Sequence, residues 1–292
     1  MNTRHLVDKY IISHWDPAVK TRKELDKEKK IIVNVNNYCN LDCFSCVSLC
    51  HLPYGNPWRD NPRNINPQDV DIALTHILNT REYHYATLAG GEPTASLSQL
   101  EEINNVIHSH KLKTQLLTNG YKVPELNPHN YDYIVIDHHG TNKQDVENAV
   151  KHLKNHSYTN YYIHQAREHH DFGEALTRPH TSPGPYACPG WMQHTLWLDV
   201  IYPCCGMPQM EGWLNTTAIR DSLRREGWTT ENPELTHTLR QWRHTIPAEI
   251  VKFCLFNCWK YREPYVTKNI VAEKKARLRA LDEAKLRTSE EK

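Results

Sequence analysis

Short apolar runs alternate along the chain with stretches of helical spacing, and this alternation constrains the fold more than any other feature. Five runs predict strands, because they are rich in β-branched and aromatic residues and end at turn signals: Ile31–Asn36, Tyr85–Ala89, Thr114–Thr118, Tyr133–Asp137 and Tyr161–Gln165. Two stretches between them, LSQLEEINNVIHSH and KQDVENAVKHLKNH, have helical spacing. The pattern predicts an α/β fold with a parallel sheet, and ligand chemistry at the carboxyl ends of its strands.

The character of the sequence changes after the last of these strands. Proline and glycine cluster in RPHTSPGPYACPG, and the following TLWLDVIYPCC predicts a β-hairpin or paired strand. We expect a helical lead-in over 1–30, a barrel-like domain over 31–175, a smaller domain over 176–265 and a charged C-terminal helix over 266–292.

The cysteines point to metal ligation rather than to disulfide bonds. The chain of 292 residues has nine of them, an odd number, and its N-terminus has no signal-peptide pattern. Four lie between Cys39 and Cys50, and five between Cys188 and Cys258. No apolar run approaches the length of a membrane span, so we expect a soluble, cytoplasmic protein with no membrane partner. The formal net charge of +1 predicts no global attraction to nucleic acid.

Cys39, Cys43 and Cys46 directly follow the first predicted strand, so three thiols share one loop. Soft thiolates suit both iron–sulfur clusters and zinc. A zinc site needs a fourth ligand, which Cys50 could supply. The alternative is that Cys50 is a small buried side chain, and the pattern alone leaves both metals open.

The spacing of Cys39, Cys43 and Cys46 resembles the CxxxCxxC signature of the radical S-adenosylmethionine superfamily. The resemblance implies a [4Fe–4S] cluster in which three thiolates hold three irons and the fourth iron binds S-adenosylmethionine. The superfamily usually has an aromatic residue immediately before the last cysteine, whereas this chain has Ser45 there and Phe44 before it. We expect this departure to weaken the contact with adenine and to leave the cluster intact.

Further motifs extend the resemblance over about residues 31–170 and imply a partial (β/α)6 TIM-like barrel. Two glycines after a strand indicate only a close approach of the backbone, but a GGEP segment at this place binds the methionine amino group in the superfamily. LLTNG resembles the third barrel strand. The implied cofactor-binding residues are Phe44, Ser45, Gly90, Gly91, Glu92, Thr118, Asn119, Asp137 and Arg167. For Asp137 and Arg167 the alternative is a polar residue of a surface loop.

The segment LWLDVIYPCC resembles the hairpin of the twitch and SPASM extensions, which carry auxiliary [4Fe–4S] clusters. It implies a small C-terminal twitch-like extension, a β-hairpin plus helix, with a cluster on Cys188, Cys204, Cys254 and Cys258. Cys205 is the alternative hairpin ligand, because adjacent strand residues point to opposite faces. Structural zinc is the alternative metal.

Histidines after two predicted strands are candidates for acid–base chemistry. His138 and His139 follow the fourth strand, and His169 and His170 follow the fifth. We name His138 and His139 as the catalytic candidates. The alternative is that all of them are solvated loop residues.

The superfamily resemblance implies an enzyme that reductively cleaves S-adenosylmethionine to a 5′-deoxyadenosyl radical, with electrons from an external flavodoxin- or ferredoxin-type donor. The size, the single extension and the CNLDCFSC context also resemble phage thymidine-hypermodification radical isomerases. They imply isomerisation of an amino-acid-modified thymine of the glycinyl-thymidine type, in DNA or a nucleotide, within the host cytoplasm. The alternatives are a small-molecule dehydrogenase and a peptide maturase that use the auxiliary cluster. A zinc-bound interaction module would leave GGEP and LLTNG unexplained.

Overall fold

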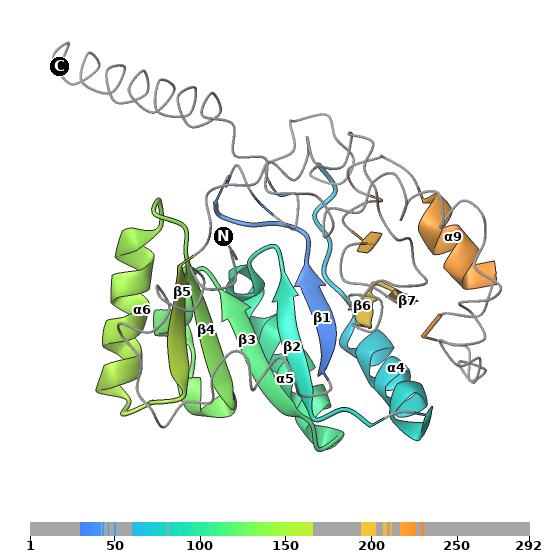
Figure 1. Ribbon diagram of the computed structural model, residues 1–292, viewed down its shortest axis with the longest axis horizontal. Helices are drawn as coiled ribbons and strands as arrows, with labels where there is room; N and C mark the ends of the chain where they lie inside the picture. The colour runs from blue at the N-terminus through green and yellow to red at the C-terminus, as the bar shows by residue number, and fades with distance from the viewer. Residues whose placement is uncertain are drawn as a thin grey trace, which may run out of the picture.

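A sheet of seven strands forms the centre of the molecule, in the order β5-β4-β3-β2-β1-β6-β7 (Figure 1). The computed structural model describes residues 30–41, 43, 46, 50, 60–80, 82–165, 194–202, 207–208, 211, 217–225 and 229–230. Neighbouring strands from β5 to β6 are parallel, and β7 runs antiparallel to β6. The predicted α/β fold with a parallel sheet is therefore confirmed. Within the described residues, the edge strands β5 and β7 do not pair with each other, so the sheet is open.

The strands are β1 (Lys30–Asn36), β2 (Tyr85–Gly90), β3 (Lys113–Thr118), β4 (Tyr133–His138), β5 (Tyr161–Gln165), β6 (Thr195–Trp197) and β7 (Val200–Tyr202). The five strands predicted for the barrel agree with β1 to β5 to within one residue at each end. The predicted hairpin is confirmed as β6 and β7. It extends the main sheet, because Ile32 and Val33 of β1 pair with β6.

The helices are α4 (Pro67–Thr80), α5 (Leu97–Ser109), α6 (Lys143–Asn155) and α9 (Ala218–Arg225), with short 3₁₀ turns η2 (Pro93–Ser96), η3 (Val123–Glu125) and η4 (Pro128–Asn130). Helices α5 and α6 confirm the two predicted ones, whereas α4 was not predicted. Its signals are nevertheless present. Asn66 Oδ1 accepts from the Gln68 backbone N–H at 3.0 Å, as a helix cap does, and Val70, Leu74 and Ile77 are buried at helical spacing.

The hydrophobic core lies between the sheet and the helices. One buried hydrophobic cluster contains alternate residues of β1, β2 and β4 and one residue of β3, together with residues of α4, α5 and α6. Its members from these four strands are Ile31, Val33, Val35, Ala86, Leu88, Leu116, Ile134 and Ile136. Side chains alternate between the faces of a strand, so the intervening residues point to the opposite face. Several of them are polar, including Asn34, Thr87, Gln115 and Asp137. Thr87 Oγ1 donates to Gln115 Oε1 at 3.1 Å on this second face.

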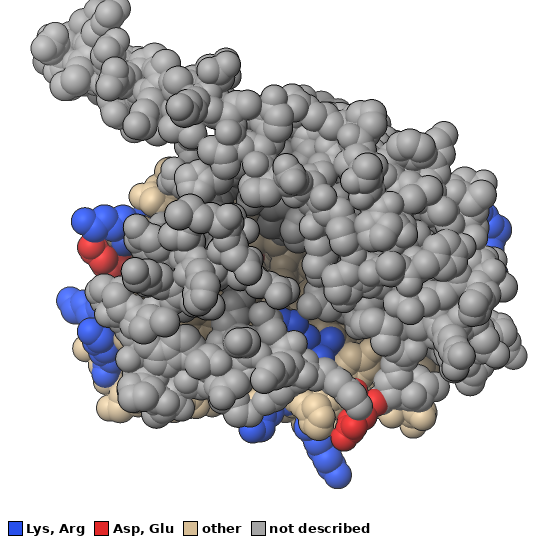
Figure 2. Space-filling model, in the orientation of Figure 1, with Lys and Arg blue, Asp and Glu red and all other residues tan. Residues whose placement is uncertain are grey.

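Helix length and the distribution of charge over the described residues bear on contacts with a membrane or a polyanion. No helix among them is long and apolar enough to cross a bilayer. The described Lys and Arg side chains visible in Figure 2 lie in several separate groups, some of them beside acidic side chains.

Candidate active site

The loop that carries the first cysteines is hydrogen-bonded to the end of β2. The Gly91 backbone N–H donates to Asn36 O at 2.9 Å and to Asn36 Oδ1 at 3.1 Å. The Glu92 N–H donates to Tyr38 O at 2.7 Å, and Asn36 Nδ2 donates to Glu92 O at 2.7 Å. Asn36 and Tyr38 immediately precede Cys39, so the GGEP segment fixes where the cysteine loop begins.

The two glycines of GGEP permit this contact. A Cβ atom on Gly91 would lie 2.0 Å from Tyr38 O, and one on Gly90 would lie 2.3 Å from Asn36 O. Gly90 also has a φ of +134°, which other residues rarely adopt. The sequence predicts a close approach of the backbone to a ligand at this place. The structure shows that the backbone approaches the cysteine loop itself, while the contact of GGEP with the methionine amino group stays a prediction.

Three partly buried thiols gather on the loop after β1. Cys39, Cys43 and Cys46 form no disulfide bond, and the Cys46 N–H donates to Cys43 O at 3.1 Å, which closes a turn between the last two. The pKa of the Cys39 thiol is raised to about 12, chiefly by burial. The nearby charges of Glu92, Cys46 and Cys43 act in the same direction as burial, and a hydrogen bond from the Leu41 backbone acts against it. The three thiols therefore lie within electrostatic range of one another.

The surroundings of Cys39 fit a metal-bound thiolate. The Leu41 N–H lies 3.3 Å from Cys39 Sγ and Asn119 Nδ2 lies 3.4 Å from it, so two donors face the sulfur. Such donors stabilise the deprotonated form that binds iron. Among the described residues, no three His, Cys, Asp or Glu side chains are arranged around a single metal ion. A [4Fe–4S] cluster does not need that arrangement, because each of its thiolates binds a different iron.

Cys50 lies beneath this loop rather than on its surface. It is 8% exposed, and its Sγ donates to Asn37 O at 3.6 Å. Its backbone N–H donates to Cys46 Sγ at 3.4 Å. A hydrogen bond with the Cys46 thiol and burial both raise the pKa of Cys50 well above its usual value. These contacts match a buried small side chain, which is the second of the two interpretations given for Cys50.

Glu92 joins the ends of β2 and β3. Its side chain is 1% exposed, and Oε1 accepts hydrogen bonds from the Thr94 N–H, Thr94 Oγ1 and Thr118 Oγ1 at 3.0, 2.7 and 2.6 Å. Its Oε2 accepts from the Asn119 N–H at 2.7 Å. Burial raises the pKa of Glu92, and these four donors work in the opposite direction. In this structure the carboxylate thus fixes the first residue after β3.

Asn119 connects β3 to the cysteine loop. Its Nδ2 donates to Asn40 Oδ1 at 2.9 Å as well as to Cys39 Sγ. Its backbone O accepts from Asn142 Nδ2 at 2.7 Å. Asn142 Nδ2 also donates to Asp137 O at 2.8 Å, so Asn142 bridges the ends of β3 and β4.

The end of β4 presents the predicted Asp137, His138 and His139 at the same edge of the sheet. All three are partly exposed. Asp137 Oδ1 forms a 2.6 Å contact with Nδ1 of His164, which is its register partner on β5. The backbone N–H of His139 donates to Asn142 Oδ1 at 2.8 Å. Sequence analysis did not single out His164, although a polar residue in the strand YYIHQ is a signal that could have identified it.

The structure brings together at one edge the described members of the predicted cofactor and catalytic set: Cys39, Cys43, Cys46, Gly90, Gly91, Glu92, Thr118, Asn119, Asp137, His138 and His139. The remaining predicted site residues lie outside the described residues: Phe44, Ser45, Arg167, His169, His170, Cys188, Cys204, Cys205, Cys254 and Cys258.

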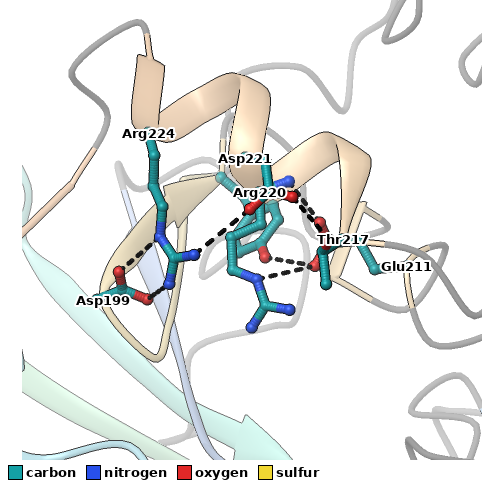
Figure 3. A network of polar contacts seen from close by, with 7 residues as sticks. Asp199, Glu211, Thr217, Arg220, Asp221 and Arg224 are labelled. Atoms are coloured by element: carbon teal, nitrogen blue, oxygen red, sulfur yellow. Dashed lines mark hydrogen bonds and ion pairs between the residues drawn. The ribbon is translucent and has the colours of Figure 1, made fainter.

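A second polar network ties α9 to the β6–β7 hairpin (Figure 3). Arg224 binds the Asp199 carboxylate with two hydrogen bonds of 2.8 and 2.7 Å. Burial opposes ionisation of Asp199, but Arg224 outweighs it and lowers the pKa of that carboxyl. Glu211 is 4% exposed and accepts from Tyr202 Oη at 2.8 Å and from the Arg220 N–H. Burial raises the pKa of Glu211 to about 7.

Comparisons with known proteins give only distant similarities. No protein-family model and no curated protein matches the chain. A solved structure of BtrN in complex with AdoMet and 2-DOIA is similar with a TM-score of 0.48 and 14% identity, over 82% of this chain and 97% of that one. Streptococcus suis SuiB bound to S-adenosylmethionine gives a TM-score of 0.32 and 11% identity, over 61% and 60% of the two chains. SuiB bound to precursor peptide SuiA gives 0.33 and 11%, over 71% of each chain.

Proposed function

We propose that this protein is a radical S-adenosylmethionine enzyme. One observation carries the proposal: the cysteine loop after β1 is hydrogen-bonded both to the GGEP segment after β2 and to Asn119 after β3. Three motifs that are separate in the sequence therefore meet at the carboxyl edge of a parallel sheet, where α/β folds bind ligands.

When bound, a [4Fe–4S] cluster and S-adenosylmethionine supply one-electron cleavage to methionine and a 5′-deoxyadenosyl radical, and hence hydrogen abstraction from a substrate C–H bond. Cys39, Cys43 and Cys46 hold three irons and leave one for the cofactor. The GGEP backbone binds the methionine end. The electron comes from an external flavodoxin- or ferredoxin-type protein.

The residues at the other strand ends have distinct parts in this proposal. Thr118 Oγ1 donates to Glu92 and accepts from the Gly120 N–H at 3.0 Å, so Thr118 positions the β3 turn, while its predicted contact with the cofactor stays a prediction. The partly exposed Asp137 carboxylate would accept hydrogen bonds from the ribose hydroxyl groups of the cofactor, because carboxylate oxygens are acceptors only. Its contact with His164 Nδ1 fixes the orientation of that carboxylate.

An electron paramagnetic resonance measurement tests this function. Anaerobically reconstituted, dithionite-reduced protein is expected to show a cluster signal that changes when S-adenosylmethionine is added. Cys43→Ala should lose the responsive signal, whereas the matched control Cys50→Ala should keep it, because Cys50 is buried under the loop. A reduced cluster whose electron paramagnetic resonance signal does not change on addition of S-adenosylmethionine would contradict the proposal.

For the substrate we propose an amino-acid-modified thymine of the glycinyl-thymidine type in phage DNA, rearranged in the host cytoplasm. The support is the sequence resemblance and the chain's near-neutral charge, which suits a few local contacts rather than a long track on DNA. The modified base has to leave the stack to approach a buried radical, so single-stranded or flipped DNA should be the better substrate.

Mass spectrometry after anaerobic turnover separates the candidate reactions. Isomerisation gives a nucleoside of unchanged mass and altered chromatographic mobility. Loss of two mass units would instead indicate a dehydrogenase, and turnover of peptides alone would indicate a maturase. Either of these results would overturn the substrate proposal and leave the radical chemistry in place.

A further inference from the structure

The Asn119 side chain gives each of its two amide N–H groups one acceptor in the cysteine loop. Nδ2 lies 3.4 Å from Cys39 Sγ and 2.9 Å from Asn40 Oδ1. Asn119 is 5% exposed, so water has little access to these contacts. The residue lies 80 positions from Cys39 in the sequence, and only the packing of β3 beside β2 and β1 brings the two together.

The orientation of this amide is determined by its neighbours. The oxygen and nitrogen of an asparagine amide are distinguished by their hydrogen-bond partners. Here the Tyr121 N–H donates to Asn119 Oδ1 at 3.0 Å, so the oxygen must face Tyr121. The nitrogen must then face Cys39. On the backbone, Glu92 Oε2 accepts from the Asn119 N–H and Asn142 Nδ2 donates to Asn119 O, each at 2.7 Å.

We propose that Asn119 sets the reduction potential of the cluster by donating a hydrogen bond to the Cys39 thiolate, and that Glu92 is the positioning residue that holds Asn119 in place. The inference rests on the proposed function, because it assumes an iron–sulfur cluster on Cys39. Hydrogen bonds to a ligating sulfur favour the reduced state, which carries more negative charge. Asn119 therefore raises the potential and makes the cluster easier to reduce.

Asn119 is the donor that mutation can remove. The other donor to Cys39 Sγ is the Leu41 backbone N–H at 3.3 Å, which no side-chain change deletes. Asn119→Leu removes the donor at similar size. Asn119→Asp keeps an oxygen for the Tyr121 N–H and replaces the donor by a charge. Asn104→Leu is the matched control, because Asn104 is also buried and its Nδ2 donates to Asn130 O at 2.9 Å, so the change removes a buried amide donor whose acceptor lies outside the cysteine loop.

The measurement is a redox titration of reconstituted full-length protein, followed by electron paramagnetic resonance, with iron content determined on the same samples. Both Asn119 variants are expected to hold as much iron as wild type and to have a more negative midpoint potential. Glu92→Gln is expected to shift the potential in the same direction, because an amide N–H placed toward the Asn119 N–H displaces that residue. Asn104→Leu should keep the wild-type potential.

Two results would overturn the inference. One is a wild-type midpoint potential in iron-loaded Asn119→Leu and Asn119→Asp. The other is failure of both variants to retain iron that wild type holds, which would make Asn119 a requirement for assembly rather than a modulator of potential. Wild-type protein that takes up no cluster at all would instead contradict the proposed function, so the two failures are distinguishable.

Discussion

Replacing Gly91 with alanine should force apart the end of β2 and the cysteine loop. The added Cβ would lie 2.0 Å from Tyr38 O, 2.5 Å from its C and 2.7 Å from its N, all of them backbone atoms that cannot rotate away. Relief of these contacts requires a shift of about 1 Å, which would break the hydrogen bonds from the Gly91 and Glu92 N–H groups to Asn36 O and Tyr38 O. Each lost hydrogen bond should lower the free energy of unfolding by about 1 kcal/mol, and overpacking should lower it by about 1–3 kcal/mol. For Gly91→Ala we therefore expect the free energy of unfolding to fall by roughly 3–5 kcal/mol.

The assay pairs urea unfolding with iron content after anaerobic reconstitution. The matched control is Leu153→Ala, which removes a fully buried side chain of α6 on the far side of β4 and β5 from β1 (Figure 1). Leu153→Ala should lower the free energy of unfolding by a comparable amount, about 2–5 kcal/mol for a buried leucine. It should leave the cluster on Cys39, Cys43 and Cys46 in place. Gly91→Ala should lose iron as well as stability. Wild-type iron content and stability in Gly91→Ala would refute the reasoning.

Three further predictions concern the metal content, the hairpin and the cofactor contact. Reconstituted wild type should hold about eight irons per chain, four for each of two cubanes, whereas stoichiometric zinc with about four irons would show that the second cysteine group is misread. Burial raises the pKa of Glu211 from 4.5 to about 7. The folded state then binds more protons than the unfolded state, so the free energy of unfolding should fall by up to about 3 kcal/mol between these pH values. Urea unfolding at pH 5 and pH 8 measures this fall, and an equal fall in Glu211→Gln would assign it to another group. Asp137→Ala should weaken S-adenosylmethionine binding about tenfold, equivalent to about 1.4 kcal/mol, in a titration; unchanged affinity would remove Asp137 from the site.

The strands were predictable because β1 to β5 each contain a short run rich in apolar, β-branched or aromatic residues that ends at a turn signal. Helix α4 shows what a search for such runs misses. Its longest apolar run is the three-residue Ile72–Leu74, and polar residues interrupt the remaining apolar positions of PQDVDIALTHILNT. The cap at Asn66 and the spacing of its buried residues are helix signals, but neither forms an apolar run.

The composition of the site was predictable, and its internal connections were not. CxxxCxxC, GGEP and LLTNG can each be recognised locally. The packing of Gly91 on Tyr38 cannot be recognised locally, and neither can the hydrogen bond from Asn119 to Cys39. Both contacts depend on which strands are neighbours and on the register of their pairing. The contact between Asp137 and His164 likewise exists because β4 and β5 pair those two positions.

Formation of 5′-deoxyadenosine tests the central claim most directly. Reconstituted wild-type protein, incubated anaerobically with S-adenosylmethionine and dithionite, should release 5′-deoxyadenosine and methionine, measured by liquid chromatography and mass spectrometry. Cys43→Ala should release none while keeping the absorbance of the auxiliary cluster, because a site with three thiolates cannot spare one. Iron-loaded wild type that forms no 5′-deoxyadenosine, or Cys43→Ala that forms it at the wild-type rate, would contradict the assignment of this loop.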